Sequence, residues 1–167
     1  MRNDLNVIKK SKDLSGMIFE ITERSPKKFR FTLVSKMQNL SLEVISELYM
    51  ANDTFVDMKI ISDMNKTIDF TKNIKSFKSE EERIYYRNKI FELKMTRAVK
   101  TEERVSRRLE HSYAALTKIK ELDWLITLSA QMQCITTKQQ ERLAMLVYEV
   151  RSLIGGFIKS DKRRFNY

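Results

Sequence analysis

The chain has few of the residues that build turns, since its 167 residues include three glycines and one proline. Glycine and proline supply the backbone angles that tight turns need, so their scarcity excludes a turn-rich β-sheet or a fold built on Gly-rich loops. The 42% of hydrophobic and 32% of charged residues are typical of a soluble, helix-dominated protein. At this length we expect a single domain over residues 1–167.

Residues for catalysis and metal binding are equally scarce. The chain has one histidine, His111, and one cysteine, Cys134, which excludes a His-rich metal site and an internal disulfide within one chain. We expect His111 to form an ion pair or a cap, and Cys134 to be a buried structural thiol. The Glu-x-x-His spacing of di-iron bundles, a Gly-rich phosphate loop and a nucleophile elbow do not occur. The sequence therefore predicts no catalytic residue, no metal, no cofactor and no enzyme activity.

Long apolar runs are missing as well. No stretch approaches the roughly 20 apolar residues that span a membrane, and the first residues, MRNDLNVIKKSKD, contain no continuous apolar region of the kind found in signal peptides. A single cysteine also fits a reducing compartment. These features predict a cytoplasmic protein with no membrane partner.

The clearest helix lies between Pro26 and Asn52. Its apolar residues recur every three or four positions, which places them on one face of a helix. They are Phe29, Leu33, Met37, Leu40, Val44 and Leu48. Pro26 suits a first helical turn and Asn52-Asp53 suits an exit, so we expect a helix over residues 27–51.

Four further segments have helical patterns. Residues 1–10 are expected to form an unanchored arm, and Ser11 is expected to cap a short helix that stops at Arg24-Ser25 before the proline. Residues 54–75 show a weaker helical pattern. Ser79 precedes a glutamate at the spacing of a capping box, and residues 80–131 contain no glycine or proline, which allows one very long helix or two stacked helices, with the regular period favouring one. Thr136 or Thr137 is expected to cap a last helix, and a Gly155-Gly156 pair within that helix favours close approach of another helix.

These elements predict an all-α fold, an antiparallel up-and-down four-helix bundle with an inserted helical extension at about residues 54–104. Some apolar residues lie off the main stripes and are expected to contact other copies of the chain. These are Leu42, Ile45, Tyr49 and Leu125.

Positive charge is abundant, with 32 Lys and Arg against 22 Asp and Glu and a formal net charge of +10. This surplus favours a polyanionic partner, and nucleic acid rather than a membrane, because the apolar faces are needed for the core. Three clusters make up the candidate binding residues, which are Arg24, Lys27, Lys28 and Arg30; Arg97, Lys100, Arg104, Arg107 and Arg108; and Lys159, Lys162, Arg163 and Arg164. Binding through phosphates should be sensitive to salt. Trp124 is expected in the core or an interface rather than as a platform for base stacking.

Three stretches resemble a known family. Pro26–Asn52 with its KMQNLSLEVISELYMAN, the run Ala115–Asp123, and Cys134–Lys162 with its SLIGGFIKSDK ending are similar to the four-helix-bundle family of the Avd accessory proteins of diversity-generating retroelements. The same family includes proteins encoded in intervening sequences of ribosomal RNA genes. The chain departs from the short family pattern by the insertion at about residues 54–104.

The resemblance implies a basic homopentamer without catalytic activity, which binds a reverse transcriptase and RNA or DNA during mutagenic copying. We therefore expect an accessory protein that forms homo-oligomers and binds nucleic acid beside a reverse transcriptase. The alternatives are a structural helical oligomer, or a protein of the ribosomal RNA intervening-sequence type, without a reverse-transcriptase partner. An RNA-processing enzyme would need a catalytic constellation that the sequence lacks.

Overall fold

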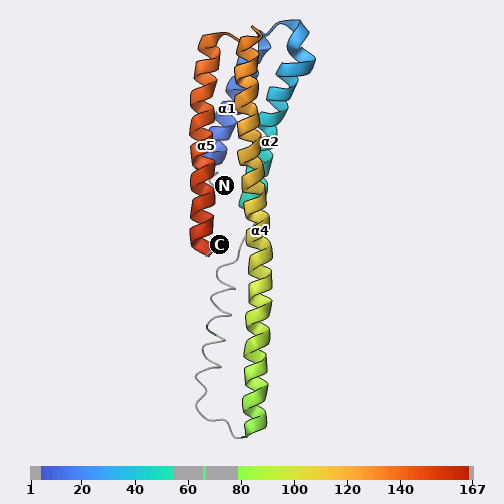
Figure 1. Cartoon of the computed structure of the whole chain (residues 1–167), viewed down its shortest axis with the longest axis vertical. Coiled ribbons are helices and arrows are strands. Elements are labelled where there is room, and N and C mark those ends of the chain that lie inside the picture. The colour runs from blue at the N-terminus through green and yellow to red at the C-terminus, as the bar shows by residue number, and fades with distance from the viewer. Residues whose placement is uncertain (1–4, 55–65, 67–78, 166–167) are drawn as a thin grey trace. The chain divides into compact units, whose positions relative to one another are not determined.

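The structure is a computed structural model that describes residues 5–54, 66 and 79–165, with only the backbone at positions 97, 100 and 165. The described part of the chain contains only helical elements. Its elements are α1 (Asn6–Glu23), the 3₁₀ turn η1 (Lys27–Phe29), the π-helical turn η2 (Arg30–Val34), α2 (Ser35–Asp53), α4 (Glu80–Gln131) and α5 (Thr137–Phe165) (Figure 1). The prediction of a helix-dominated chain is confirmed.

The chain divides into two units, one formed by Met1–Asp53 with Arg108–Tyr167 and the other by Thr54–Arg107. In the first unit, α1, α2, the last part of α4 and α5 bury one apolar face each. Helix α1 lies against both α2 and α5 (Figure 1). The large side chains that are fully buried include Ile18 of α1, Leu40 of α2, Ile119 of α4 and Leu143 and Ile154 of α5.

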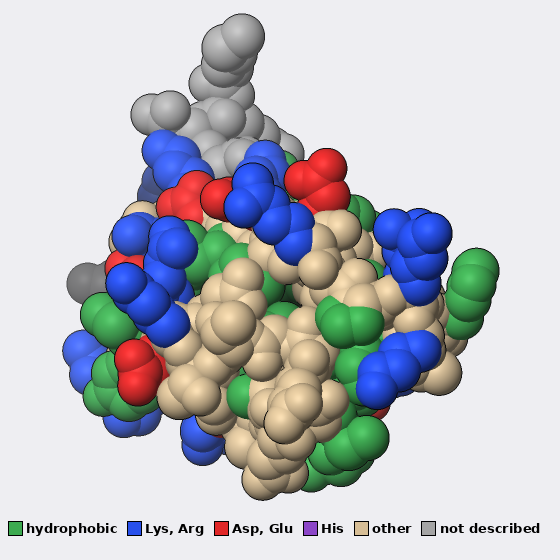
Figure 2. All heavy atoms as spheres, turned by 90° about the horizontal axis from the view of Figure 1, so that it is seen from above, with side chains coloured by type: hydrophobic (Ala, Val, Ile, Leu, Met, Phe, Trp, Pro, Cys, Tyr) green, Lys and Arg blue, Asp and Glu red, His purple; other side chains and the backbone are tan. Residues whose placement is uncertain are grey.

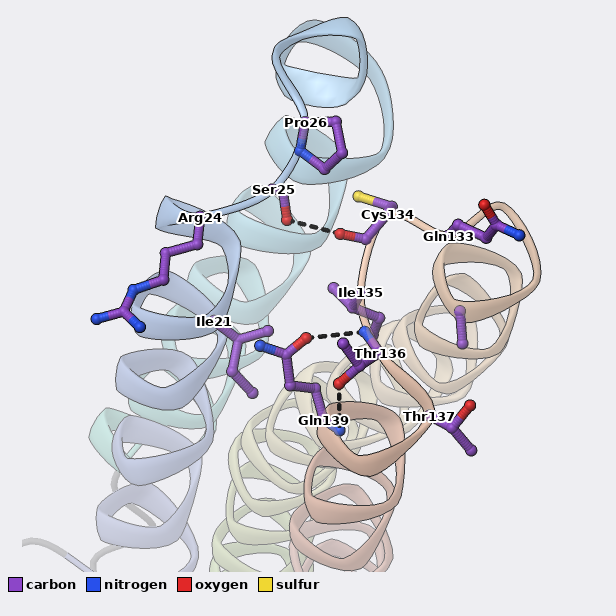
Figure 3. Close-up of a pocket in the computed structure, with 11 residues that line it drawn as sticks. Ile21, Arg24, Ser25, Pro26, Gln133, Cys134, Ile135, Thr136, Thr137 and Gln139 are labelled. Atoms are coloured by element: carbon purple, nitrogen blue, oxygen red, sulfur yellow. Dashed lines mark hydrogen bonds between the residues drawn. The ribbon is translucent and has the colours of Figure 1, made fainter.

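The two connections of the first unit meet at one end, which we call the connection end (residues 24–26 and 132–136). There the Ser25 hydroxyl donates a hydrogen bond of 3.0 Å to the carbonyl oxygen of Cys134 (Figure 3). Both residues are buried. The bond therefore ties the turn after α1 to the turn after α4.

Two helix starts follow the predicted capping pattern. The amide of Glu82 donates to the Ser79 hydroxyl at 3.2 Å, and α4 begins at the next residue after Ser79. The amide of Gln139 donates to the Thr136 hydroxyl at 3.2 Å, while the Gln139 side chain accepts from the Thr136 amide at 2.8 Å. Each pair satisfies amides that would otherwise have no helical partner.

The start of α1 corrects two predictions. Helix α1 begins at Asn6, so Ser11 lies inside the helix, where its hydroxyl donates to the carbonyl of Val7 at 2.8 Å instead of capping an amide. Val7 and Ile8 are 5% and 0% exposed. Residues 6–10 are thus part of the core helix and not a free arm, because two buried apolar side chains anchor them.

The segment predicted as one helix over 27–51 is helical but not uniform. A 3₁₀ turn and a π turn precede α2, which ends at Asp53. A π turn contains more residues than an α turn, and it shifts the buried position from the predicted Leu33 to Val34. Leu33 is half-buried, whereas Val34 is 6% exposed.

Helix α4 is one continuous helix of 52 residues, which decides between the two predicted arrangements. Apolar side chains of α4 such as Val105, Leu109, Ile119 and Ile126 are buried, whereas Ile84, Phe91 and Met95, nearer its start, are 51–65% exposed. The expected helix at 54–75 lies outside the described residues, apart from Thr54 and Lys66. None of the described helices carries an apolar stretch that could cross a membrane.

The residues predicted to contact other helices or other copies of the chain differ in their exposure. Leu125 is 5% exposed and belongs to the core, which corrects its predicted role as an oligomer contact, whereas Leu42 is 50% exposed. Gly155 and Gly156 lie inside α5, and a Cβ atom built on either would meet no atom within 4 Å. Within the described residues, no neighbouring helix therefore approaches α5 closely at the glycine pair, and a close approach by another copy of the chain stays a prediction.

Candidate nucleic-acid interface

The first basic cluster lies at the connection end. Arg24 follows α1, Lys27 and Lys28 form η1, and Arg30 begins η2, and all four side chains are exposed. Among the described residues, no carboxylate pairs with any of them, and Lys28 contacts the ring of Phe29 at 4.7 Å. Figure 2 shows the molecule from this end, with Lys and Arg side chains around hydrophobic ones. These cations are available to phosphates.

A pocket of about 520 Å³ opens beside this cluster. Its polar lining includes Arg24, Thr136, Thr137 and Gln139. Thr136 and Gln139 are bonded to each other in the helix cap, and the Arg24 guanidinium points away from them (Figure 3). Ser25, Thr136 and Gln139 of the lining are thus already bonded, and the Arg24 side chain points out of the pocket.

The second cluster is divided between the two units. Arg97, Lys100, Arg104 and Arg107 lie in the second unit, and the side chains of the first two are outside the described residues. Arg107 donates to Glu103 at 3.4 Å on the exposed face of α4, and Arg104 also has a partner. This part of the cluster stays a predicted site.

The prediction that Arg108 belongs to the second cluster is corrected. Its side chain is turned into the first unit and is 12% exposed. Its Nε donates to Asp161 at 2.6 Å, its Nη1 donates to the carbonyl of Ala51 at 2.8 Å, and its guanidinium lies 4.7 Å from the ring of Phe157. The Asp161 side chain is 4% exposed. Arg108 therefore holds α2, α4 and α5 together and is removed from the predicted binding residues.

The third cluster lies in the last turns of α5, which ends at Phe165. Lys159, Lys162, Arg163 and Arg164 are exposed, while Asp161 among them is buried against Arg108. The ammonium of Lys162 lies 5.5 Å from the ring centre of Tyr113 on α4. Arg164 has a partner as well.

The first cluster lies near the start of α5, and the third cluster lies at the end of that helix. Thr137, beside the connection end, and Lys159 are separated by roughly 33 Å at 1.5 Å per helical residue. One short stretch of nucleic acid cannot contact both ends with the same phosphates. The first and third predicted clusters are therefore separate surfaces of the first unit.

A network of acids and bases joins α2 to α4 in the first unit. Glu47 accepts from His111 at 2.8 Å and from Lys118 at 3.3 Å, and Lys118 also bonds Glu43 at 2.8 Å. Burial would raise the pKa of Glu47, but the hydrogen bonds from His111 and Lys118 outweigh it and hold that pKa below its ordinary value. The hydrogen bond to Glu43 raises the pKa of Lys118, against the opposing effect of burial. His111, for which an ion pair or a cap was predicted, thus forms a hydrogen bond with the carboxylate of Glu47 on α2.

The remaining candidate side chains have plain positions. Cys134 is 3% exposed, which confirms a buried thiol. Trp124 is 61% exposed and therefore does not belong to the core of the chain. In the described part of the chain, no group of three or more His, Cys, Asp or Glu residues is arranged to hold a metal ion.

Sequence reasoning did not include the basic residues on the outer faces of α4 and α5, such as Lys120 and Arg151, which are exposed. Helical spacing connects Arg151 to the predicted Lys162, whereas it connects Lys120 to Tyr113, an exposed ring that the sequence did not indicate as part of a site. Lys120 follows Tyr113 by seven residues and Arg151 precedes Lys162 by eleven, and both intervals return to the same face of a helix.

Comparison with known proteins adds no assignment. A scan against protein-family models found no match to this chain, and a search of curated proteins also found none.

Proposed function

We propose that the chain is a non-catalytic accessory protein that binds RNA or DNA, forms homo-oligomers and works beside a reverse transcriptase in a diversity-generating retroelement. The observation that carries nucleic-acid binding is the first basic cluster, four exposed cations at one end of a bundle unit with no carboxylate partner among the described residues. The formal charge of +10 supports it. The reverse transcriptase, the pentamer and the cytoplasmic location rest on sequence features and the resemblance to the Avd family.

The architecture in this proposal is an antiparallel up-and-down four-helix bundle with residues of about 54–104 inserted. Two contacts support it. Ser25 bonds Cys134 at the connection end, and Arg108 bonds both Ala51 and Asp161 at the far ends of α2 and α5. Both contacts fit consecutive helices that run in opposite directions, because α1 and α4 end where α2 and α5 follow, and α2 and α5 end beside the point where α4 enters the first unit.

The test is a salt titration of binding to fluorescent RNA and DNA of unrelated sequences. Affinity should fall steeply with salt because bound cations release counterions from the nucleic acid, by about 0.7–0.9 in logarithmic slope per phosphate contact. The variant Lys27→Gln/Lys28→Gln/Arg30→Gln should weaken binding to all sequences and reduce the slope. Lys36→Gln, which replaces an exposed lysine paired with Glu121, is the matched control. Unchanged affinity and slope in the triple variant would remove the first cluster from the interface.

The alternative is a structural helical oligomer whose charge serves only to keep it in solution. Exposed apolar side chains such as Leu42 and Met50, at 50% and 53%, favour contacts between copies in either case. A protein that oligomerises and binds no nucleic acid at low salt would support this alternative. Metal-dependent cleavage of nucleic acid, abolished by a point change in this chain, would instead indicate an enzyme.

A further inference from the structure

The outer surface between α4 and α5 combines exposed aromatic rings with unpaired cations. Tyr113 and Trp124 of α4 and Tyr148 of α5 are 43%, 61% and 75% exposed. Isolated exposed apolar residues are common on proteins, whereas several on one surface mark a binding site.

The contact between Lys162 and Tyr113, at 5.5 Å, fixes which faces of α4 and α5 adjoin each other. On α4, Lys120 and Trp124 follow Tyr113 by seven and eleven residues, which are two and three helical turns. On α5, Arg151 and Tyr148 precede Lys162 by eleven and fourteen residues, which are three and four turns. These six residues therefore line one surface, which we call the α4–α5 seam.

The seam is positively charged. Among the described residues, Lys120, Arg151 and Lys162 have no carboxylate partner, and all three are exposed. The neighbouring acids Glu121 and Glu149 are paired with Lys36 at 3.3 Å and Lys10 at 3.0 Å, on other helices.

Two further carboxylates, of Glu110 and Asp123, border the seam, the first exposed and the second half-buried. Glu141 precedes Tyr148 by seven residues and is also exposed, and the exposed Lys159 lies about one turn before Lys162. Within the described residues, four cations thus face three carboxylates at the edges of the seam. The rings and the cations are interleaved along the surface, so an anionic chain is attracted along its whole length.

The middle of the seam has no side chain on α5. Gly155 precedes Lys162 by seven residues, on the same face, and a Cβ atom there would meet nothing within 4 Å. Space is thus left between the Tyr113–Lys162 pair and the Trp124 end, which suits a flat group lying against the helix.

We propose that the α4–α5 seam binds single-stranded RNA or DNA, with bases stacked on Trp124, Tyr148 and Tyr113 and phosphates paired with Lys120, Arg151 and Lys162. This inference rests on the proposed nucleic-acid function and names its site and its ligand. Aromatic rings stack on unpaired bases regardless of sequence, and adjacent cations hold the backbone. In a duplex the base faces are stacked on each other, so the rings have nothing to bind and only the cations act.

Trp124 is the only tryptophan in the chain, so its fluorescence reports on this surface alone. We expect a fluorescein-labelled oligo(dT) of about 15 nucleotides to quench that fluorescence as it binds, with the same midpoint as the anisotropy of the label. A duplex of the same length should bind with less quenching.

The variants separate stacking from charge. Trp124→Ala and Tyr148→Ala should each lower the affinity for oligo(dT) about tenfold, with the logarithmic salt slope unchanged, because a stacked ring releases no counterion. Arg151→Gln should reduce that slope by about 0.7. Phe19→Ala, which removes a ring of 42% exposure on α1, is the matched control and should leave both quantities unchanged.

Different failures have different meanings. Binding by anisotropy without quenching, together with normal affinity of Trp124→Ala, would overturn the seam and leave the proposed function standing. No binding of either nucleic acid at low salt would overturn both. A lower oligomer mass of Trp124→Ala in light scattering, with unchanged affinity, would instead make the seam a contact between copies of the chain.

Discussion

Arg108 and Asp161 are separated by 53 residues in the sequence, yet their charged groups form a hydrogen bond of 2.6 Å. Asp161 lies among the cations of the third cluster, where a carboxylate is expected to be exposed. It is buried because Arg108 enters from α4 and neutralises it. The pair joins the last turns of α5 to the point where α4 leaves the second unit.

We expect Arg108→Gln to lower the free energy of unfolding by about 3 kcal/mol, because it leaves the buried carboxylate of Asp161 without its charged partner. Arg107→Gln is the control, since Arg107 is 62% exposed and its pair with Glu103 should contribute no more than about 0.5 kcal/mol. Urea unfolding followed by circular dichroism measures both. Equal effects of the two changes would contradict a structural role for Arg108. The double variant Arg108→Met/Asp161→Leu should recover much of the loss.

The bundle should lose stability in acid through Glu47. Since the pKa of Glu47 is lowered in the folded chain, its ionised form stabilises the fold above its ordinary pKa, and that contribution disappears as the pH falls through the folded value. The urea midpoint should therefore drop below about pH 4.5, and less steeply in Glu47→Gln. Glu20→Gln, a change at an exposed carboxylate of α1, should keep the slope of the unchanged protein. Parallel acid curves for all three proteins would contradict this role.

Gly16 and Gly156 lie inside α1 and α5, and neither has a positive φ or an atom within 4 Å of an added Cβ. Alanine at either position should raise the free energy of unfolding by about 0.5–1 kcal/mol, because glycine has more backbone freedom to lose.

The same variants test self-assembly. In light scattering, the unchanged protein should have the mass of a homo-oligomer. If Gly156 lies in a close contact between copies, Gly156→Ala will lower that mass, whereas Gly16→Ala will not. A monomer mass for the unchanged protein would contradict the predicted oligomer.

The first unit should fold without the second. Arg108 contacts the carbonyl of Ala51 at 2.8 Å, so the chain leaves and re-enters the first unit at neighbouring points. We expect replacement of Thr54–Arg107 by a short Gly/Ser linker to leave a helical protein with one cooperative thermal transition. The Arg108→Gln variant of the shortened chain is the destabilised reference, and its transition should occur at a lower temperature. A shortened chain without a cooperative transition would show that the second unit is needed for folding.

Much of the helical layout could be predicted because it depends on local patterns. Two helix caps join residues that are three positions apart in the sequence, Thr136 with Gln139 and Ser79 with Glu82. The stripe of Leu40, Val44 and Leu48 repeats every four residues, and all three side chains are buried. The same rules missed the start of α1, because Ser11 is a good cap by type but the burial of Val7 and Ile8 extends the helix past it.

The site depended on contacts that no local pattern contains. Arg108 resembles its neighbours Arg104 and Arg107 in the sequence, and only the packing of α5 turns it inward. Trp124 is next to buried positions in the sequence. Adjacent residues of a helix point in different directions, so the sequence alone does not say whether its side chain lies in the core or on the surface. The positions of the first and third clusters at opposite ends of α5 follow from the assembled helices, which composition does not describe.

The hydrogen bond between Ser25 and Cys134 holds the connection end closed, and the rate of thiol labelling at Cys134 measures how often this end opens. Cys134 is the only cysteine and is 3% exposed, so a thiol reagent can react only while this end is open. The labelling rate therefore equals the rate for an exposed thiol multiplied by the fraction of molecules open there, when closing is fast. Compared with the global unfolding equilibrium, that rate distinguishes fraying of the two turns from loss of the whole fold. Ser25→Ala should accelerate the labelling more than it lowers the urea midpoint.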